Sequence, residues 1–270
     1  MRIYINSKNR DTSSVSASDF RVTLTRPVEF PEGAVAYVDS ITMSHTFPTI
    51  VAGLNDRLYV DFHSGGVRAP REIDIPAGTY EIATLATALQ TALNAAKPDA
   101  ASTVTVTPDG NHRMTITATG LSAPDRVQIF SKEQLRRGEH PDIPLPITFD
   151  LRDACAVVGV NTGTFQANLQ GGITTQFCNF QLYKQIYLHS SNLGEASSHA
   201  PDGSQTCIAA ISVGNTVAGD VISSHHQGLT ASSLALPSFL DSIHVQLKSA
   251  DGKVIDTNGH DVCFTLVTSN

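Results

Sequence analysis

Short runs in which apolar and polar residues alternate dominate this sequence and constrain its fold more than any other feature. In residues 20–24 and 243–247 every second side chain is apolar, and such runs are separated by Gly, Pro, Asn and Asp. Alternation with a period of two is typical of strands that bury one face. Further strand-like runs lie at 34–43, 58–62, 72–75, 126–130, 181–189, 207–213, 217–222 and 262–266. Many evenly scattered strands with long loops predict a mainly β protein with a jelly-roll β-sandwich.

One segment departs from the alternation and predicts a helix. Between Gly78 and Pro98 apolar residues recur at spacings of three and four, in an alanine-rich background, which indicates a helix over 81–96. Its apolar stripe is most simply the face that packs on an adjoining sheet. A hairpin is expected next, around a turn at 108–111.

Strand-like runs lie on both sides of this helix and hairpin, so we expect a sandwich that is discontinuous in sequence. We assign 18–78 and 166–270 to the jelly-roll domain and 79–165 to an inserted α+β segment. Residues 1–17 form an N-terminal arm. Its first part, 3–5, resembles a small strand, whereas the rest is polar and nearly free of apolar anchors. Such an arm is either a disordered tail or a strand that adds to the sheet edge of another subunit.

Composition limits the classes of partner. Lys and Arg number 18 against 25 Asp and Glu, a formal charge of -7, which argues against nucleic acid as the main partner. Charged residues make up only 16%, below the roughly 25% of ordinary soluble domains, and this favours a surface covered by partners. We expect no membrane span, because no apolar run approaches the ~20 residues that a membrane helix needs. The first residues also lack the apolar region of a secretory signal.

The reactive residue types form no pattern that indicates chemistry, and we expect no catalytic residues, no cofactor and no metal site. His225 and His226 are adjacent in a Ser/Gly-rich stretch, where a solvated loop is the favoured interpretation; convergence with His189 and His199 in space stays open. The Gly-rich stretches lack the Lys-Ser/Thr of a phosphate loop. The four cysteines are widely spaced, which favours free thiols in a reducing compartment.

Several short motifs occur in an order that is specific as a set. The chain begins with IYINSKNRD at 3–11 and SDF at 18–20, and continues with IPAGTY at 75–80, VVGV at 157–160 and IYLHS at 186–190. This order resembles the vertex (penton) capsid proteins of virophages, Polinton-like viruses and some large DNA viruses of eukaryotes.

The resemblance implies a structural viral protein: a single jelly roll that forms a homopentamer at the icosahedral vertex of the virion. Its neighbours would be the major capsid protein and, as further candidates, minor capsid proteins. Synthesis in the host cytoplasm or nucleus is implied as well. On this view the arm is mobile in the free subunit and supplies inter-subunit contacts, with Lys8 and Arg10 pairing with acidic groups. The contact residues that we expect are Asn6, Lys8, Arg10, Asp11 and Phe20.

Two alternatives to a vertex protein remain. A receptor- or glycan-binding β-sandwich, such as an attachment or spike protein, would favour exposed aromatic residues in loops, but aromatic residues make up only 6% of this chain. A minor cement protein of a capsid is the other alternative.

Overall fold

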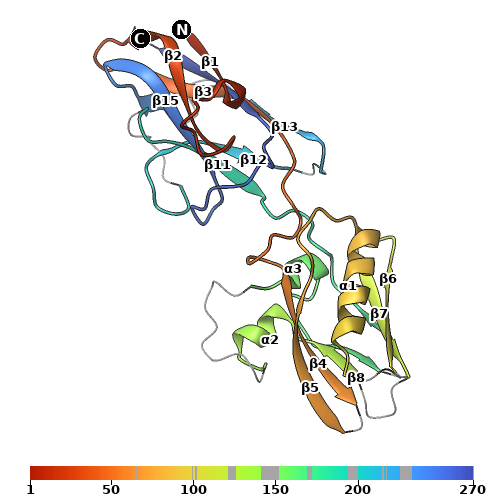
Figure 1. The fold of residues 1–270 in the computed structure, drawn as a ribbon. Coiled ribbons are helices and arrows are strands. Elements are labelled where there is room, and N and C mark those ends of the chain that lie inside the picture. The colour runs from red at the N-terminus through yellow and green to blue at the C-terminus, as the bar shows by residue number, and fades with distance from the viewer. Residues whose placement is uncertain are drawn as a thin grey trace. The chain divides into compact units, whose positions relative to one another are not determined.

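The computed structural model describes residues 1–64, 66–98, 100, 102–120, 126–140, 152–168, 172–193, 200–214, 216, 218–225 and 233–269. The chain divides into two compact units, both drawn in Figure 1. The sandwich unit comprises Met1–Phe47 and Tyr183–Asn270, and the inserted unit comprises Pro48–Leu182. Each unit has a hydrophobic core of its own.

The sandwich unit contains two antiparallel sheets. The first sheet has the strand order β1 (Arg2–Asn6), β16 (Val262–Ser269), β3 (Val35–Ser44), β13 (Val221–His225), with the short β14 (Leu234–Ala235) also paired to β3. The second has the order β12 (Cys207–Ser212), β11 (Gln185–Ser190), β15 (Phe239–Lys248), β2 (Asp19–Glu29). When the eight longer strands are counted along the sandwich unit, the sheets follow the orders 1-8-3-6 and 5-4-7-2. These are the interleaved connections of a jelly roll, so the predicted fold class is confirmed.

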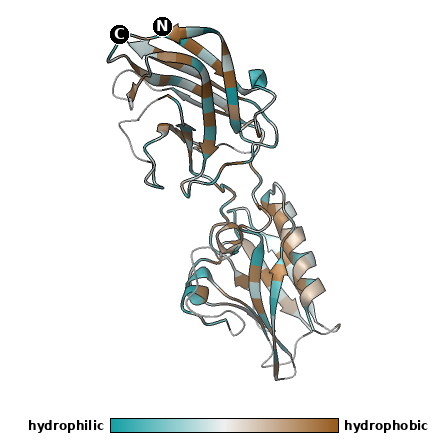
Figure 2. Ribbon diagram, turned by 60° about the vertical axis from the view of Figure 1, so that its left-hand side comes forward, coloured by the Kyte–Doolittle hydropathy of each residue, from teal (hydrophilic) through white to brown (hydrophobic). Residues whose placement is uncertain are grey.

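Alternation along the strands fills the space between these sheets. Ile5, Phe264 and Ile41 lie side by side on β1, β16 and β3, and all three are buried. The next row on the same strands, Tyr4, Thr265 and Ser40, points to the outer face. Figure 2 shows the resulting change between hydrophobic and hydrophilic residues along the ribbons. The period-two pattern therefore places one apolar set of side chains in the core.

The described part of the inserted unit combines one long helix and two short ones with two sheets. Its elements are β4 (Arg57–Ser64), β5 (Val67–Asp74), α1 (Ile82–Ala96), β6 (Thr103–Pro108), β7 (Met114–Thr119), β8 (Arg126–Ile129), α2 (Lys132–Arg136), α3 (Cys155–Val158), β9 (Phe165–Asn168) and β10 (Ile173–Thr174). The sheets have the orders β5-β4-β8-β9 and β10-β7-β6. Leu85, Leu89 and Leu93 of α1 are fully buried in one cluster with Val104 and Ile116 of the hairpin. The predicted helix and hairpin are therefore present, and the apolar stripe of the helix packs inside the unit.

The inserted unit begins earlier in the chain than the sequence analysis placed it. Strands β4 and β5 were expected in the jelly roll, within 18–78, but they pair with each other, β4 also pairs with β8, and both belong to the inserted unit. The expected second boundary, at 166, likewise lies at 182–183. The reason is that alternation identifies a strand without identifying its sheet. On β4 the side chains of both faces are buried, Leu58 on one and Tyr59 on the other, as in a strand inside a separate core.

An ion-pair network lies at the start of β4. Asp56 is only 5% exposed, and it accepts hydrogen bonds from Nε and Nη2 of Arg152 at 2.8 and 2.6 Å and from the backbone N–H of Gly53 at 2.9 Å. The Arg152 guanidinium lowers the pKa of Asp56 below its ordinary value of 3.8, an effect that burial partly opposes. The network joins residues almost 100 positions apart within the inserted unit.

No helix in the described part of the chain is both long and apolar enough to cross a membrane.

Candidate functional site

The N-terminal arm packs on its own subunit in this structure. Strand β1 pairs with β16 from Arg2↔Val267 to Asn6↔Cys263 and forms an edge of the first sheet. Its Ile5 is 2% exposed and belongs to the sandwich core. The small strand expected at 3–5 is thus present, and the arm is anchored better than its polar composition indicated.

Three of the predicted contact residues lie on one turn after β1. The Asn6 side-chain oxygen accepts a hydrogen bond from the Lys8 backbone N–H at 2.8 Å and caps a short 3-10 helix, η1 (Ser7–Asn9). Arg10 donates to the Ser7 carbonyl at 3.0 Å and lies 3.6 Å from the Asp261 carboxylate. Lys8 is exposed and forms no ion pair with any described residue. The acidic partner of Arg10 is therefore found within the same subunit, in an exposed pair of a kind that contributes little to stability.

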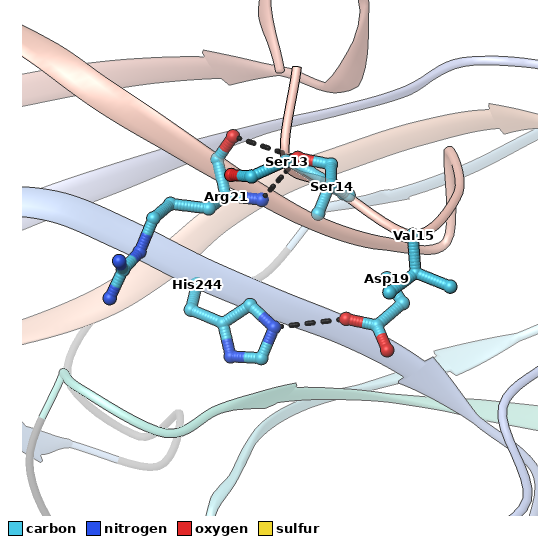
Figure 3. A pocket seen from close by; sticks show the side chains of 7 residues that line it. Ser13, Ser14, Val15, Asp19, Arg21 and His244 are labelled. Carbon is cyan, nitrogen blue, oxygen red and sulfur yellow. Dashed lines mark hydrogen bonds and ion pairs between the residues drawn. The ribbon is translucent and has the colours of Figure 1, made fainter. Parts of the chain in front are cut away.

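Residues 11–16, here called the strap, follow the outer edge of β2. The backbone N–H of Asp11 donates to the Arg21 carbonyl at 2.8 Å. The Asp11 carboxylate accepts from the backbone N–H of Thr23 at 3.2 Å and from its hydroxyl at 2.9 Å. The Ser14 hydroxyl accepts from the Arg21 N–H at 3.0 Å, as the dashed lines of Figure 3 indicate. The predicted contact residue Asp11 is thus bound to β2.

The last residue of the strap, Ser16, also forms hydrogen bonds with β2, at Asp19. Its backbone N–H donates to the Asp19 carbonyl, and its hydroxyl accepts from the Asp19 N–H, both at 3.0 Å. Strand β2 is the last strand of the second sheet, and among the described strands it pairs only with β15. An unpaired edge of this kind attracts other strands, and here the strap bonds the N–H groups of Asp19, Arg21 and Thr23 and the C=O groups of Asp19 and Arg21.

Phe20 is not a contact residue in this structure. Its side chain is fully buried in the sandwich core, and Phe20 pairs with Val245 of β15. The expectation that Phe20 contacts a neighbouring subunit is therefore wrong for this conformation. The alternation that begins at β2 turns Phe20 inward, whereas Asp19 and Arg21 lie on the outer face.

Sequence reasoning missed a polar network beside the strap. His244 of β15 has its Nε2 2.9 Å from Asp19 Oδ1 and its Nδ1 2.8 Å from the Ser191 hydroxyl. Gln246 donates to the second Asp19 oxygen at 3.0 Å. His244 also lines a shallow pocket of about 230 Å³, in which Figure 3 shows it below Ser13, Ser14 and Val15 of the strap.

The hydrogen bonds from Ser191 to His244 and from His244 to Asp19 link the same three residue types as the Ser-His-Asp triad of hydrolases. This arrangement lies on the outer face of a sheet, and each side chain is bonded to its neighbours. We interpret it as a cross-strand network that joins β2, β15 and the end of β11. No signal in the sequence marks it, because Asp19 and His244 are more than 200 residues apart.

The outer face of the first sheet contains a second shallow pocket, of about 300 Å³. None of its lining residues carries a formal charge: Tyr4, Ile5, Asn6, Asn9, Ser40, Thr42, Cys263, Phe264 and Thr265. The predicted contact residue Asn6, which caps η1, also lies here, opposite Cys263. The buried centre of a protein interface is depleted in charge in the same way.

The remaining candidate residues do not form a metal or redox site among the described residues. No group of three His, Cys, Asp or Glu is placed to hold a metal there. His225 is exposed at the end of β13, whereas His189 is buried in β11, where burial lowers its pKa. His199 and His226 lie outside the described residues, as do Gly65, Gln170 and Gly171. All four cysteines are free thiols, and burial raises the pKa of Cys155 well above its ordinary value.

Comparisons with known proteins relate the chain to solved structures, by fold and not by sequence. No protein-family model and no curated protein sequence matches it. The crystal structure of the mavirus penton protein is similar over 100% of this chain and 99% of its own length, with a TM-score of 0.58 and 10% sequence identity. The flagellar cap protein FliD of Escherichia coli gives a TM-score of only 0.18, at 12% identity over 100% of this chain and 57% of its own length, and carries no argument. The chain thus shares the fold of a penton protein, and the resemblance noted in the sequence is confirmed at the level of the fold.

Proposed function

We propose that this chain is a structural capsid protein whose homopentamer forms the vertex of an icosahedral virion. Jelly rolls serve many functions, so the sandwich alone decides little. The observation that carries the proposal is the likeness to the mavirus penton protein over the whole of both chains, which includes the inserted unit as well as the sandwich. Virion localisation and the absence of an enzymatic role are part of the same proposal.

A closed ring requires that one flank of each subunit contacts a different flank of the next. A stable interface of this kind buries on the order of 2,000 Å² or more. The uncharged part of the outer face of the first sheet, around Tyr4, Thr42 and Cys263, suits one of these flanks because little desolvation of charge opposes its burial. The N-terminal arm borders this face, since β1 forms its edge. The major capsid protein, and minor capsid proteins as further candidates, would contact the outside of the ring.

The test compares two substitutions that add the same charge at exposed threonines. Thr42→Arg places a guanidinium on the outer face of the first sheet, and Thr91→Arg places one on the exposed side of α1 in the inserted unit. Both variants should keep the unfolding temperature of the wild type. Native mass spectrometry should show rings of five for the wild type and for Thr91→Arg, and mainly monomers for Thr42→Arg.

Two results would oppose the proposal. If the wild-type protein stayed monomeric at high concentration, the proposed homopentamer would be contradicted. Binding of that monomer to a glycan array would then favour an attachment protein instead. If both variants assembled equally well, the outer face of the first sheet would not be part of the interface between subunits.

A further inference from the structure

We infer that the arm, residues 1–17, exchanges between neighbouring copies, so that β1 and the strap of one subunit bind β16 and β2 of the next. The inference rests on the proposed function, because exchange requires a neighbouring subunit such as the one that the proposed ring provides. The occupant of both strand edges is then a segment of this same chain, supplied by the neighbour.

The contacts of the arm within its own subunit favour exchange. Only Ile5, Ser7 and Ala17 are buried among these residues. The strap is held by hydroxyl, carboxylate and main-chain hydrogen bonds to β2, and its one large apolar side chain, Val15, is 83% exposed. The apolar surface that removal of the arm uncovers is concentrated at β1, where Ile5 lies in the sandwich core and Ile3 packs against it, and the same strand of a neighbour would cover it again.

Exchange restores every bond that removal breaks. Without its arm a subunit has two open strand edges, one on β16 and one on β2. Both edges already fit the arm, because they bind it in the structure, and a second copy carries an identical arm. Exchange of identical elements is a low-cost route to oligomers for this reason, and in a ring each subunit would give one arm and receive one.

Exposed apolar side chains also point to a partner at the arm. Met1, Tyr4 and Val15 are 58%, 74% and 83% exposed. They are three of the eight large apolar side chains that are exposed among the described residues, although the arm is a small part of the chain. Contact with a second subunit would bury them.

The hinge of the exchange is Ala17–Ser18, because the strap bonds β2 from Asp19 onward. The strap of one subunit therefore reaches the β2 edge of the next only where the two β2 strands begin close together. The ring of the proposed function has to bring these two ends together.

A thiol cross-link distinguishes exchange from the arrangement within one subunit. Asn6 of β1 and Thr42 of β3 both lie opposite Cys263 of β16, and the other three cysteines are buried. The variants Asn6→Cys and Thr42→Cys are assembled, treated with a short bis-maleimide and separated on a denaturing gel. Strands β3 and β16 belong to the body of one subunit, so Thr42→Cys is the matched control and should yield monomers. Asn6→Cys should yield a ladder of covalently joined subunits.

Each outcome decides the inference. A ladder with Asn6→Cys alone supports exchange. Cross-linked monomers with Asn6→Cys, no cross-link at all, or equal ladders with both variants would overturn it. Because Asn6 also caps η1, the cross-link is repeated with Tyr4→Cys and Thr265→Cys, another facing pair of β1 and β16, in a Cys263→Ser background.

Native mass spectrometry of the same samples separates the two proposals. A ring whose Asn6→Cys cross-links stay within single subunits would refute exchange and leave the proposed function intact. A protein that remains monomeric with such cross-links would refute both.

Discussion

Truncation of Phe20 tests whether this residue stabilises the sandwich or binds a neighbour. The side chain is fully buried in the sandwich core. Phe→Ala substitutions at such sites cost about 3–5 kcal/mol, since burial is lost and a cavity remains. For a unit of this size each kcal/mol shifts the unfolding temperature by about 3 °C. Phe20→Ala should therefore lower the unfolding temperature of the sandwich unit by about 10–15 °C.

The matched control is Phe177→Ala, which removes the same atoms from a side chain that is 68% exposed in the inserted unit. Its free energy of unfolding should change by no more than about 0.5 kcal/mol. Differential scanning calorimetry and urea unfolding of both variants, at a concentration where the subunit is monomeric, measure the difference. If Phe20→Ala left the stability of the monomer unchanged but abolished the ring, Phe20 would be a contact residue and the core assignment would be refuted.

Three further predictions concern pH, backbone and thiols. The lowered pKa of Asp56 contributes stability that is complete above the ordinary value of 3.8 and is lost as the pH falls through the lower folded-state value. Asp56→Asn should therefore lower the free energy of unfolding of the inserted unit at pH 7 by about 1–3 kcal/mol. Below pH 4 the stability of this variant, measured by urea unfolding, should depend less on pH than that of the wild type. Gly159→Ala should destabilise the inserted unit strongly, because its Cβ would lie 2.2 Å from a backbone oxygen, and Gly163→Ala much less, because nothing lies within 4 Å there; equal thermal shifts would contradict this. In the folded monomer a maleimide should label Cys263 first, as mass spectrometry of digests can verify, since it alone of the four cysteines is partly exposed.

Local patterns were sufficient for the elements but not for their partners. The spacing of Leu85, Leu89 and Leu93 predicts α1 because a helical stripe is a property of consecutive residues. Alternation likewise predicts the strand around Val60. The sheet that this strand joins depends on β5 and β8, and alternation contains no information about partners. The early start of the inserted unit was missed for this reason.

The candidate site shows the same limit. The cluster of Asn6, Arg10 and Asp11 could be located from the motif, and the structure brings these residues to one turn and the strap that follows it. Their bonding to β2 and to Asp261 depends on contacts across the fold, as does the pairing of His244 with Asp19. A polar segment with few apolar residues looks mobile in sequence, but here the free edge of β2 supplies its hydrogen-bond partners.

The most direct test of the account is the rotational symmetry of the purified, full-length protein in single-particle electron micrographs. We expect class averages with five-fold symmetry, in which the sandwich unit of each subunit contacts the sandwich unit of the next subunit around a closed ring. Isolated subunits at all concentrations, or closed particles of another symmetry, would contradict the assignment of this chain to a capsid vertex.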